Sequence, residues 1–356
     1  MFQKGLKDVV AVHTKIASVD GEKGELRYRG ELVDKVIPNT TFEELSTFLW
    51  TGSKKPISQL FKDGRILPQH VHNLLQTLPN ELQVMDAMKA AISVFGTRSF
   101  LEKSNDTQAT LLTAALPVII ATFYRKQQGL LPLESRYDLG HTANFLYLLT
   151  GISPTSAQVE ALETYLLVTM EHGLNASTFA ARVTISTESD LPSAIVSVLG
   201  TMKGPLHGGA PSGVLALLDD MKSPEHVREV VEEKLEKGER IMGFGHRIYK
   251  TEDPRSILLR EKCLALQGAD AWLDLATYAE KEIIQLLNEH KPGRKLYTNV
   301  EFYAAAIMRA INLDPALFTP TFSMARIVGW TAHAMEQAED NTIFRPQSVY
   351  IGKKFM

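Results

Sequence analysis

The sequence predicts an all-α, mainly helical fold with a small β-hairpin near the N-terminus. Two observations carry this prediction. Apolar residues recur at helical spacing through most of the chain after residue 30, and no alternation of strands and helices indicates a nucleotide-binding sheet. With 356 residues, the chain can bury a large core and is long enough to divide into two lobes.

The strand signal lies between residues 8 and 30. An apolar run at Val9–Val12 and a second run at Gly24–Arg29 flank the turn-forming cluster Asp20–Lys23. We therefore expect a hairpin whose first strand begins close to residue 8.

Helix signals follow in order. Thr41 precedes two glutamates in a capping-box pattern, and Ser223-Pro224 and Thr319-Pro320 each indicate the start of a helix. The apolar run from Leu111 to Tyr124 is too short for a membrane span and predicts a buried helix. The segments expected to be helical or buried are 84–94, 110–125, 157–173, 193–200, 223–238 and 319 to about 338.

Composition narrows the classes of function. The formal net charge is -3, with 38 Lys and Arg against 41 Asp and Glu, and no basic block indicates a nucleic-acid partner. The single cysteine, Cys263, excludes an intrachain disulfide and fits a reducing compartment. No targeting pattern precedes the hairpin, so we expect a cytoplasmic protein without a membrane anchor.

The most informative segment runs from Gly243 to Arg255. His246 lies between glycine-rich backbone and a helix start, where Asp253 is expected to be the N-cap and Pro254 the first helical residue. Arg255 then lies in the first turn, where a cation is unfavourable unless an anion arrives. The segment predicts a carboxylate or phosphate substrate held beside a proton donor.

Other candidates are weaker when each is taken alone. His207 lies in a turn with two following glycines, where it could face a substrate or be an ordinary loop histidine. Glu301, flanked by apolar residues, is either a base with a raised pKa or a surface residue that compensates a helix dipole. Arg326, among apolar residues, needs an acidic partner or a substrate carboxylate. Arg345 and His172 have structural alternatives of the same kind. We expect no metal site, because His207 and His246 lack a third ligand at the usual spacing.

Five motifs in order resemble the citrate synthase family along almost the whole chain. They are Glu171-His172-Gly173, the segment 204–209 around His207, the segment 243–255, Asn299-Val300 with the following acid, and Arg345-Pro346. The resemblance implies a large lobe of residues 1–208 completed by 313–356, a small mobile lobe of residues 209–312, and an obligate homodimer with shared active sites. It implies no extra N-terminal domain, since the hairpin begins too early to leave room for one.

The resemblance also implies the chemistry, which is condensation of acetyl-CoA with oxaloacetate followed by hydrolysis of the citryl thioester, with no metal or redox cofactor. Glu301 would be the base, in a position where the family has aspartate. His207 would donate to the thioester oxygen and His246 to the keto oxygen of oxaloacetate. The remaining implied roles are oxaloacetate binding by His172, Arg255, Arg326 and the partner's Arg345, and CoA binding by Lys250, with Arg294 and Lys295 as weaker candidates.

Two alternatives stay open at this point. One is a 2-methylcitrate synthase that uses propionyl-CoA, because a pocket discriminates one methylene by only about 1–3 kcal/mol. The other is a paralogue with an impaired base and a metabolite-binding or regulatory role. Only the glutamate at 301 supports the second alternative, and the retained histidines and arginines argue against it.

Overall fold

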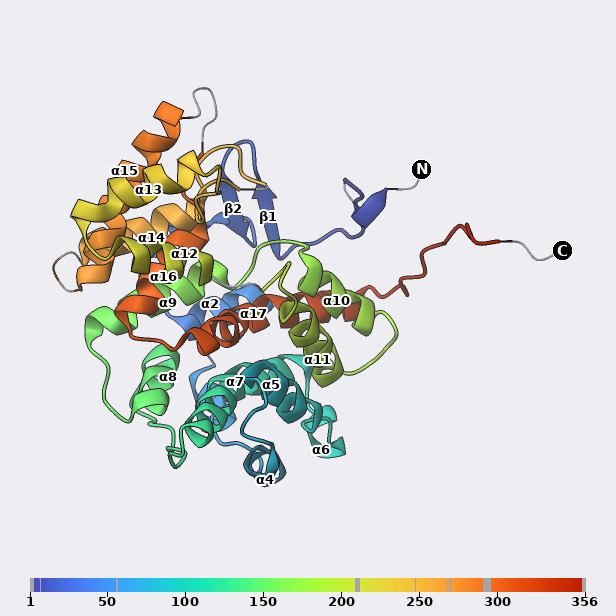
Figure 1. Cartoon of the computed structure of the whole chain (residues 1–356). Coiled ribbons are helices and arrows are strands. Elements are labelled where there is room, and N and C mark those ends of the chain that lie inside the picture. Colours follow the sequence, from blue (N-terminus) through green and yellow to red (C-terminus); the bar gives the residue numbers. More distant parts are fainter. Residues whose placement is uncertain are drawn as a thin grey trace.

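A computed structural model describes residues 3–353, apart from residues 7, 56, 209–211, 247, 267, 269 and 291–295. Helices make up most of the described chain, and one small sheet lies near the N-terminus (Figure 1). The predicted all-α class is therefore confirmed.

The sheet has three antiparallel strands in the order β1-β2-β3. They are β1 (Ala17–Asp20), β2 (Glu25–Tyr28) and β3 (Glu31–Leu32). The prediction of a first strand at Val9–Val12 is wrong. The tight turn after Asp20 pairs it directly with Glu25, so the residues just before the turn form the strand, while Val10 is 78% exposed and has no strand partner.

In the described part of the chain, eleven α-helices precede the glycine-rich turn around residue 208. Thr41 forms the predicted capping box with Glu44 at the start of the second of them. The predicted helix 157–173 ends early, at Thr169, and the residues after it form a loop that carries His172. The bounds are α1 (Val33–Val36), α2 (Phe42–Thr51), α3 (Ser58–Gly64), α4 (Gln69–Thr77), α5 (Val84–Ser93), α6 (Arg98–Leu101), α7 (Asn105–Gln127), α8 (His141–Thr150), α9 (Ser156–Thr169), α10 (Ala176–Ile185) and α11 (Leu191–Met202).

Six helices follow. Ser223-Pro224 starts a single 3-10 turn, Pro224–His226, before the α-helix begins, and Gly238 follows its end in the left-handed region with φ 71°. Asp253 is the N-cap of the Pro254 helix, as predicted. The bounds are α12 (Ser212–Met221), α13 (Val227–Glu236), α14 (Pro254–Ala265), α15 (Ala271–His290), α16 (Val300–Ala310) and α17 (Phe318–Glu339); two further 3-10 turns are Lys4–Leu6 and Pro315–Leu317.

The apolar helix α7 lies inside the protein. Among the described helices it alone is long and apolar enough to cross a membrane, and 83% of its apolar window is buried. It packs against α3, α5, α8 and α17. This burial confirms the prediction of a core helix between residues 111 and 124.

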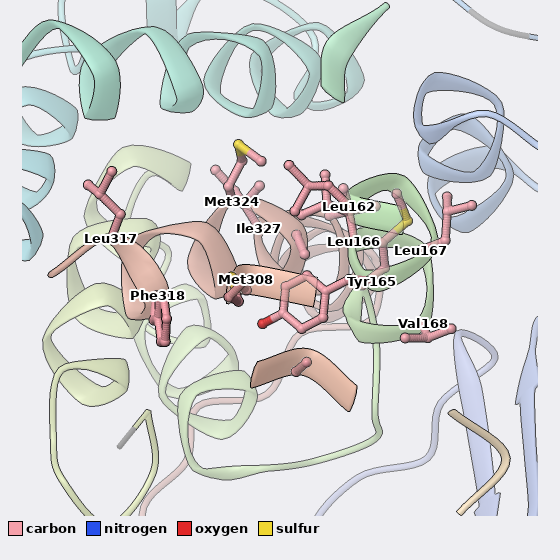
Figure 2. Packing of buried hydrophobic residues seen from close by; sticks show 14 of the residues in the cluster. Leu162, Tyr165, Leu166, Leu167, Val168, Met308, Leu317, Phe318, Met324 and Ile327 are labelled. Atoms are coloured by element: carbon pink, nitrogen blue, oxygen red, sulfur yellow. The ribbon is translucent and has the colours of Figure 1, made fainter. Parts of the chain in front are cut away.

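Helix α17 runs through the centre and contacts α2, α7, α9, α10 and α11. Figure 2 shows Leu162 and Leu166 of α9 close to Met324 and Ile327 of α17, with Met308 of α16 beside them. All five side chains belong to the buried core. This packing fixes α9, α16 and α17 relative to one another, and these helices or their ends carry three of the predicted site residues.

Helices α12 to α16 contact one another and lie together as one group in Figure 1. Two of them, α14 and α16, also pack against α9 of the remaining body. The division into lobes at residues 209 and 312 stays a prediction.

Candidate active site

Six of the predicted residues line one cavity of about 360 Å3. The cavity lies where α14 and α16 meet the loop after α9, the turn after α11 and helix α17. Residues far apart in the sequence thus face one space. The six are His172, His207, His246, Arg255, Glu301 and Arg326.

The segment carrying His246 is bound to the segment carrying Glu301. Phe244 and Thr298 form an isolated antiparallel bridge, and the Asn299 side chain donates to the carbonyl oxygen of Gly245 at 2.9 Å. Gly243 adopts φ 87°, and a Cβ there would lie 2.9 Å from Cβ of Phe302. A residue other than glycine at 243 would therefore separate the two segments.

The proton of His246 can be placed from its neighbours. Its Nδ1 accepts hydrogen bonds from the backbone N–H groups of Ile248 and Tyr249, at 3.0 and 3.1 Å. Burial, aided by the charge of Arg255, lowers the pKa of His246 to about 4, so the ring is neutral near pH 7. A neutral ring that accepts at Nδ1 carries its proton on Nε2, which faces the cavity-lining Arg255 at 3.2 Å.

Arg255 is 5% exposed, and its counter-ion is already present. The Asp253 carboxylate accepts from its Nε at 3.0 Å and its Nη2 at 2.8 Å, and also caps the helix by accepting from its backbone N–H. The expectation that the first-turn cation would lack an anion until a ligand arrives is therefore wrong. The fixed carboxylate instead holds the guanidinium in place beside His246.

His207 is oriented by the start of α10. The backbone N–H of Ser177 donates to His207 Nε2 at 3.3 Å, and the Ser177 hydroxyl lies 2.7 Å from the same nitrogen. Trp330 donates to that hydroxyl at 2.9 Å and fixes it from the core. Burial lowers the pKa of His207, so the ring is neutral, and the bond from the Ser177 N–H to Nε2 indicates that its proton is on Nδ1.

Glu301 lies in the first turn of α16, after the N-cap Asn299. Its side chain is exposed to the open cavity rather than packed in the core. The walls of the cavity nevertheless remove enough water to raise the pKa of its carboxyl, against the lowering effect of the Arg255 and Arg240 charges. An accessible carboxylate with a raised pKa is suited to proton abstraction.

Arg326 and His172 complete the wall nearest the core. Arg326 is 2% exposed and donates from Nε to the carbonyl oxygen of Thr169 at 2.6 Å. Burial and the charges of Arg255 and Arg326 lower the pKa of His172 well below its ordinary value. Two buried guanidinium groups line the cavity, and among the described residues only Arg255 has a carboxylate ion-pair partner, which leaves Arg326 able to pair with a ligand carboxylate.

Two predicted residues of the described chain, Lys250 and Arg345, do not line the cavity. Lys250 is exposed, and its backbone N–H donates to Gly21 O at 2.8 Å. Arg345 is exposed in the C-terminal segment and lines a separate cavity with residues 11–16. Arg294 and Lys295 lie outside the described residues.

Three residues that influence the site were not identified from the sequence. Ser177 and Tyr249 contact site histidines, and Arg240 influences Glu301, but each partner is distant in sequence. Within the described residues, no group of three His, Cys, Asp or Glu side chains is placed to hold a metal ion. Cys263 is buried in α14, and burial raises the pKa of its thiol to about 12, as fits a core residue rather than a nucleophile.

The fold and the cavity define a mainly helical protein with a cavity lined by two buried arginines, three histidines and one accessible glutamate. The family model for the C-terminal domain of citrate synthase matches residues 5–347. The chain belongs to the citrate synthase family.

Known proteins are similar to this chain over nearly its whole length. The citrate synthase of Synechocystis sp. is 35% identical, over 99% of this chain and 91% of that protein. A 2-methylcitrate synthase of Mycobacterium tuberculosis is also 35% identical, with the same coverage. The crystal structure of citrate synthase from Pyrobaculum aerophilum has a TM-score of 0.89 at 33% identity, covering 99% of this chain and 93% of that one. The Thermoplasma acidophilum enzyme, solved with carboxymethyl coenzyme A and oxaloacetate, has a TM-score of 0.88 at 27% identity, covering 100% and 97%.

Proposed function

We propose that this protein condenses acetyl-CoA with oxaloacetate and hydrolyses the resulting thioester to citrate and coenzyme A. The observation that carries the proposal is the convergence of two histidine N–H donors, two buried arginines and one accessible carboxylate on a single cavity. This set supplies a base for the methyl group, a donor for each carbonyl oxygen and charge for a dicarboxylate.

The first step is enolisation of the thioester. Glu301 removes a proton from the methyl group, and the Nδ1–H of His207 donates a hydrogen bond to the oxygen of the enolate that forms. Ser177 supports this role because it occupies Nε2 and leaves the proton on the other nitrogen. The methyl group is a weak acid, so base and donor are needed together.

The second step is carbon–carbon bond formation. The enolate carbon attacks the keto carbon of oxaloacetate and the carbonyl π electrons move onto the keto oxygen. The resulting alkoxide accepts a hydrogen bond from His246 Nε2–H and takes up the proton that Glu301 removed. Arg255, Arg326 and His172 bind the carboxylates, together with Arg345 from a second copy of the chain. Water then hydrolyses the citryl thioester and releases the free thiol of coenzyme A.

A homodimer follows from the assignment of Arg345 to a neighbouring site. The segments 8–14 and 341–353 extend from the helical body on the same side (Figure 1). They expose large apolar side chains, among them Val10, Val349 and Ile351. A second copy that covers these segments would bury that surface and bring its own Arg345 to the cavity. We also propose binding of CoA phosphate by the exposed Lys250, no metal or redox cofactor, and a cytoplasmic location.

The test is thiol release from acyl-CoA with a panel of 2-oxo acids. We expect release with acetyl-CoA that depends on oxaloacetate, and kcat/KM for acetyl-CoA above that for propionyl-CoA. A reversed ratio would instead identify a 2-methylcitrate synthase, a class represented among relatives of equal identity. No release with any pair would support the impaired paralogue.

A further inference from the structure

One tyrosine contacts three of the proposed oxaloacetate-binding groups without lining the cavity itself. Tyr249 is 3% exposed, and its hydroxyl lies 3.0 Å from Nε2 of His172. Its ring centroid is 4.8 Å from that of His246, and the guanidinium carbon of Arg255 lies 5.9 Å from the same centroid. Its backbone N–H also donates to His246 Nδ1.

The direction of the hydroxyl hydrogen bond follows from the surroundings. Burial raises the pKa of the Tyr249 phenol, which therefore keeps its proton, and His172 is neutral for the reasons given above. His172 is the one hydrogen-bond partner of this hydroxyl among the described residues. A buried hydroxyl that only accepted would leave its proton unbonded, so the phenol donates to Nε2 and the proton of His172 resides on Nδ1.

The backbone around Tyr249 is fixed by the N-terminal hairpin. The next residue, Lys250, donates its N–H to the carbonyl oxygen of Gly21 at the turn between β1 and β2. The chain approaches so closely there that a Cβ on Gly21 would overlap the carbonyl oxygen of Ile248. Only glycine permits this contact.

We propose that Tyr249 is a positioning residue, held by the hairpin turn at Gly21, that sets the tautomer of His172 and the orientation of the His246 ring and the Arg255 guanidinium. The proposal rests on the proposed function only in naming oxaloacetate as the ligand of these three groups. The tautomer itself is a property of the protein without substrate.

The direct test is nitrogen-15 NMR of histidine-labelled full-length protein without substrate, with the His172 signals assigned by a His172→Gln variant. We expect His172 of the parent to be protonated on Nδ1 and unprotonated on Nε2. In Tyr249→Phe, which keeps the ring, we expect that preference to be lost. An identical tautomer in parent and variant would overturn the proposal.

Kinetics give the second readout. Loss of one hydrogen bond at a neutral group changes an equilibrium constant by about 3- to 10-fold. Tyr249→Phe should therefore raise KM for oxaloacetate by that factor. KM for acetyl-CoA at saturating oxaloacetate should change less than about twofold, a split that a general loss of structure would not produce. Tyr278→Phe, at an exposed phenol on α15, is the matched control.

Gly21→Ala should raise KM for oxaloacetate in the same way, because it displaces the Tyr249 segment. Gly140→Ala, where no atom lies within 4 Å of the added Cβ, is its control. Equal rises in both KM values for Tyr249→Phe would contradict a specific role at the oxaloacetate groups. If the parent released no thiol with any 2-oxo acid, the proposed function would fail, and the NMR experiment would still decide the role of Tyr249.

Discussion

The Nε2 of His246 and the Nη2 of Arg255 lie 3.2 Å apart on the wall of the same cavity. His246 accepts two backbone hydrogen bonds at Nδ1, which leaves Nε2 as a donor, and a guanidinium has no acceptor. Two donors directed at one another are unfavourable alone and favourable with an oxygen between them. This pair therefore marks the place for an oxygen of the substrate.

The pH dependence of the rate should depend on Glu301. Its raised pKa predicts an acid limb of kcat/KM above the ordinary glutamate value of 4.5, with activity lost as pH falls through that limb. Because the Arg240 charge lowers this pKa, Arg240→Gln should move the acid limb to higher pH and leave the rate above the limb unchanged. Arg228→Gln, at a surface arginine on α13, is the control. An unchanged acid limb in Arg240→Gln would show that the Arg240 charge does not influence the pKa of Glu301.

Oxaloacetate and the acyl-CoA should bind in order. On the proposed roles, the dianion is held by groups from α14, α17 and the loop after α9, so it draws these elements together around the acyl-CoA site. Calorimetry should show a several-fold higher affinity for acetyl-CoA when oxaloacetate is present. The same affinity in both titrations would contradict this coupling.

The role of Arg345 can be tested with mixed subunits. Arg345→Ala and His246→Ala should each have little activity, since each lacks a residue of every site. Hybrid dimers contain one site with both residues intact, so mixing should restore up to about half the activity per hybrid if Arg345 acts in its neighbour. Verified subunit exchange without recovery would exclude the shared site.

Acid stability should depend on His141. This buried ring stacks on Phe42 at 4.0 Å between centroids, and burial lowers its pKa well below 6.5. The unfolded chain binds a proton near pH 6.5 and the folded chain does not, so stability is complete above that pH and decreases below it. The slope for one such group approaches about 1.4 kcal/mol per pH unit. Urea unfolding between pH 7 and 5 should show a shallower loss for His141→Phe than for the parent, and equal slopes would contradict it.

Local signals in the sequence predicted the helix starts well. Asp253 and Pro254 mark one because a side-chain cap and a proline act on neighbouring backbone groups. The prediction of a strand at Val9–Val12 was wrong because strand pairing is not a local property. It depends on the position of the turn and not on apolar character alone.

The sequence singled out six residues that line one cavity, but it did not indicate the groups that orient them. His207 needs Ser177, 30 residues away, and His172 needs Tyr249, 77 residues away. Such pairs arise where α10 packs against α11 and where α9 packs against α14, and they leave no periodic pattern. The ion pair of Arg255 with Asp253 is local in sequence. The sequence nevertheless indicated only the capping role of Asp253 and not its second role as the counter-ion of Arg255.

The central claim is that Glu301 is the base of a citrate-forming site. Glu301→Asp keeps a carboxylate: it should retain or raise kcat if the shorter side chain restores the family's geometry, and lower kcat by up to about 10²-fold if the surroundings have adapted to glutamate. Either result keeps residue 301 as the base.

The most direct measurement is thiol release by Glu301→Gln at saturating oxaloacetate, with oxaloacetate affinity determined on the same protein by calorimetry. An amide cannot take up the methyl proton, and general-base catalysis contributes about 10²- to 10⁴-fold. We predict a fall in kcat of at least 10²-fold, with oxaloacetate affinity within about twofold of the parent because the arginines and histidines are intact. Turnover of acetyl-CoA by Glu301→Gln as fast as by the parent would contradict the account.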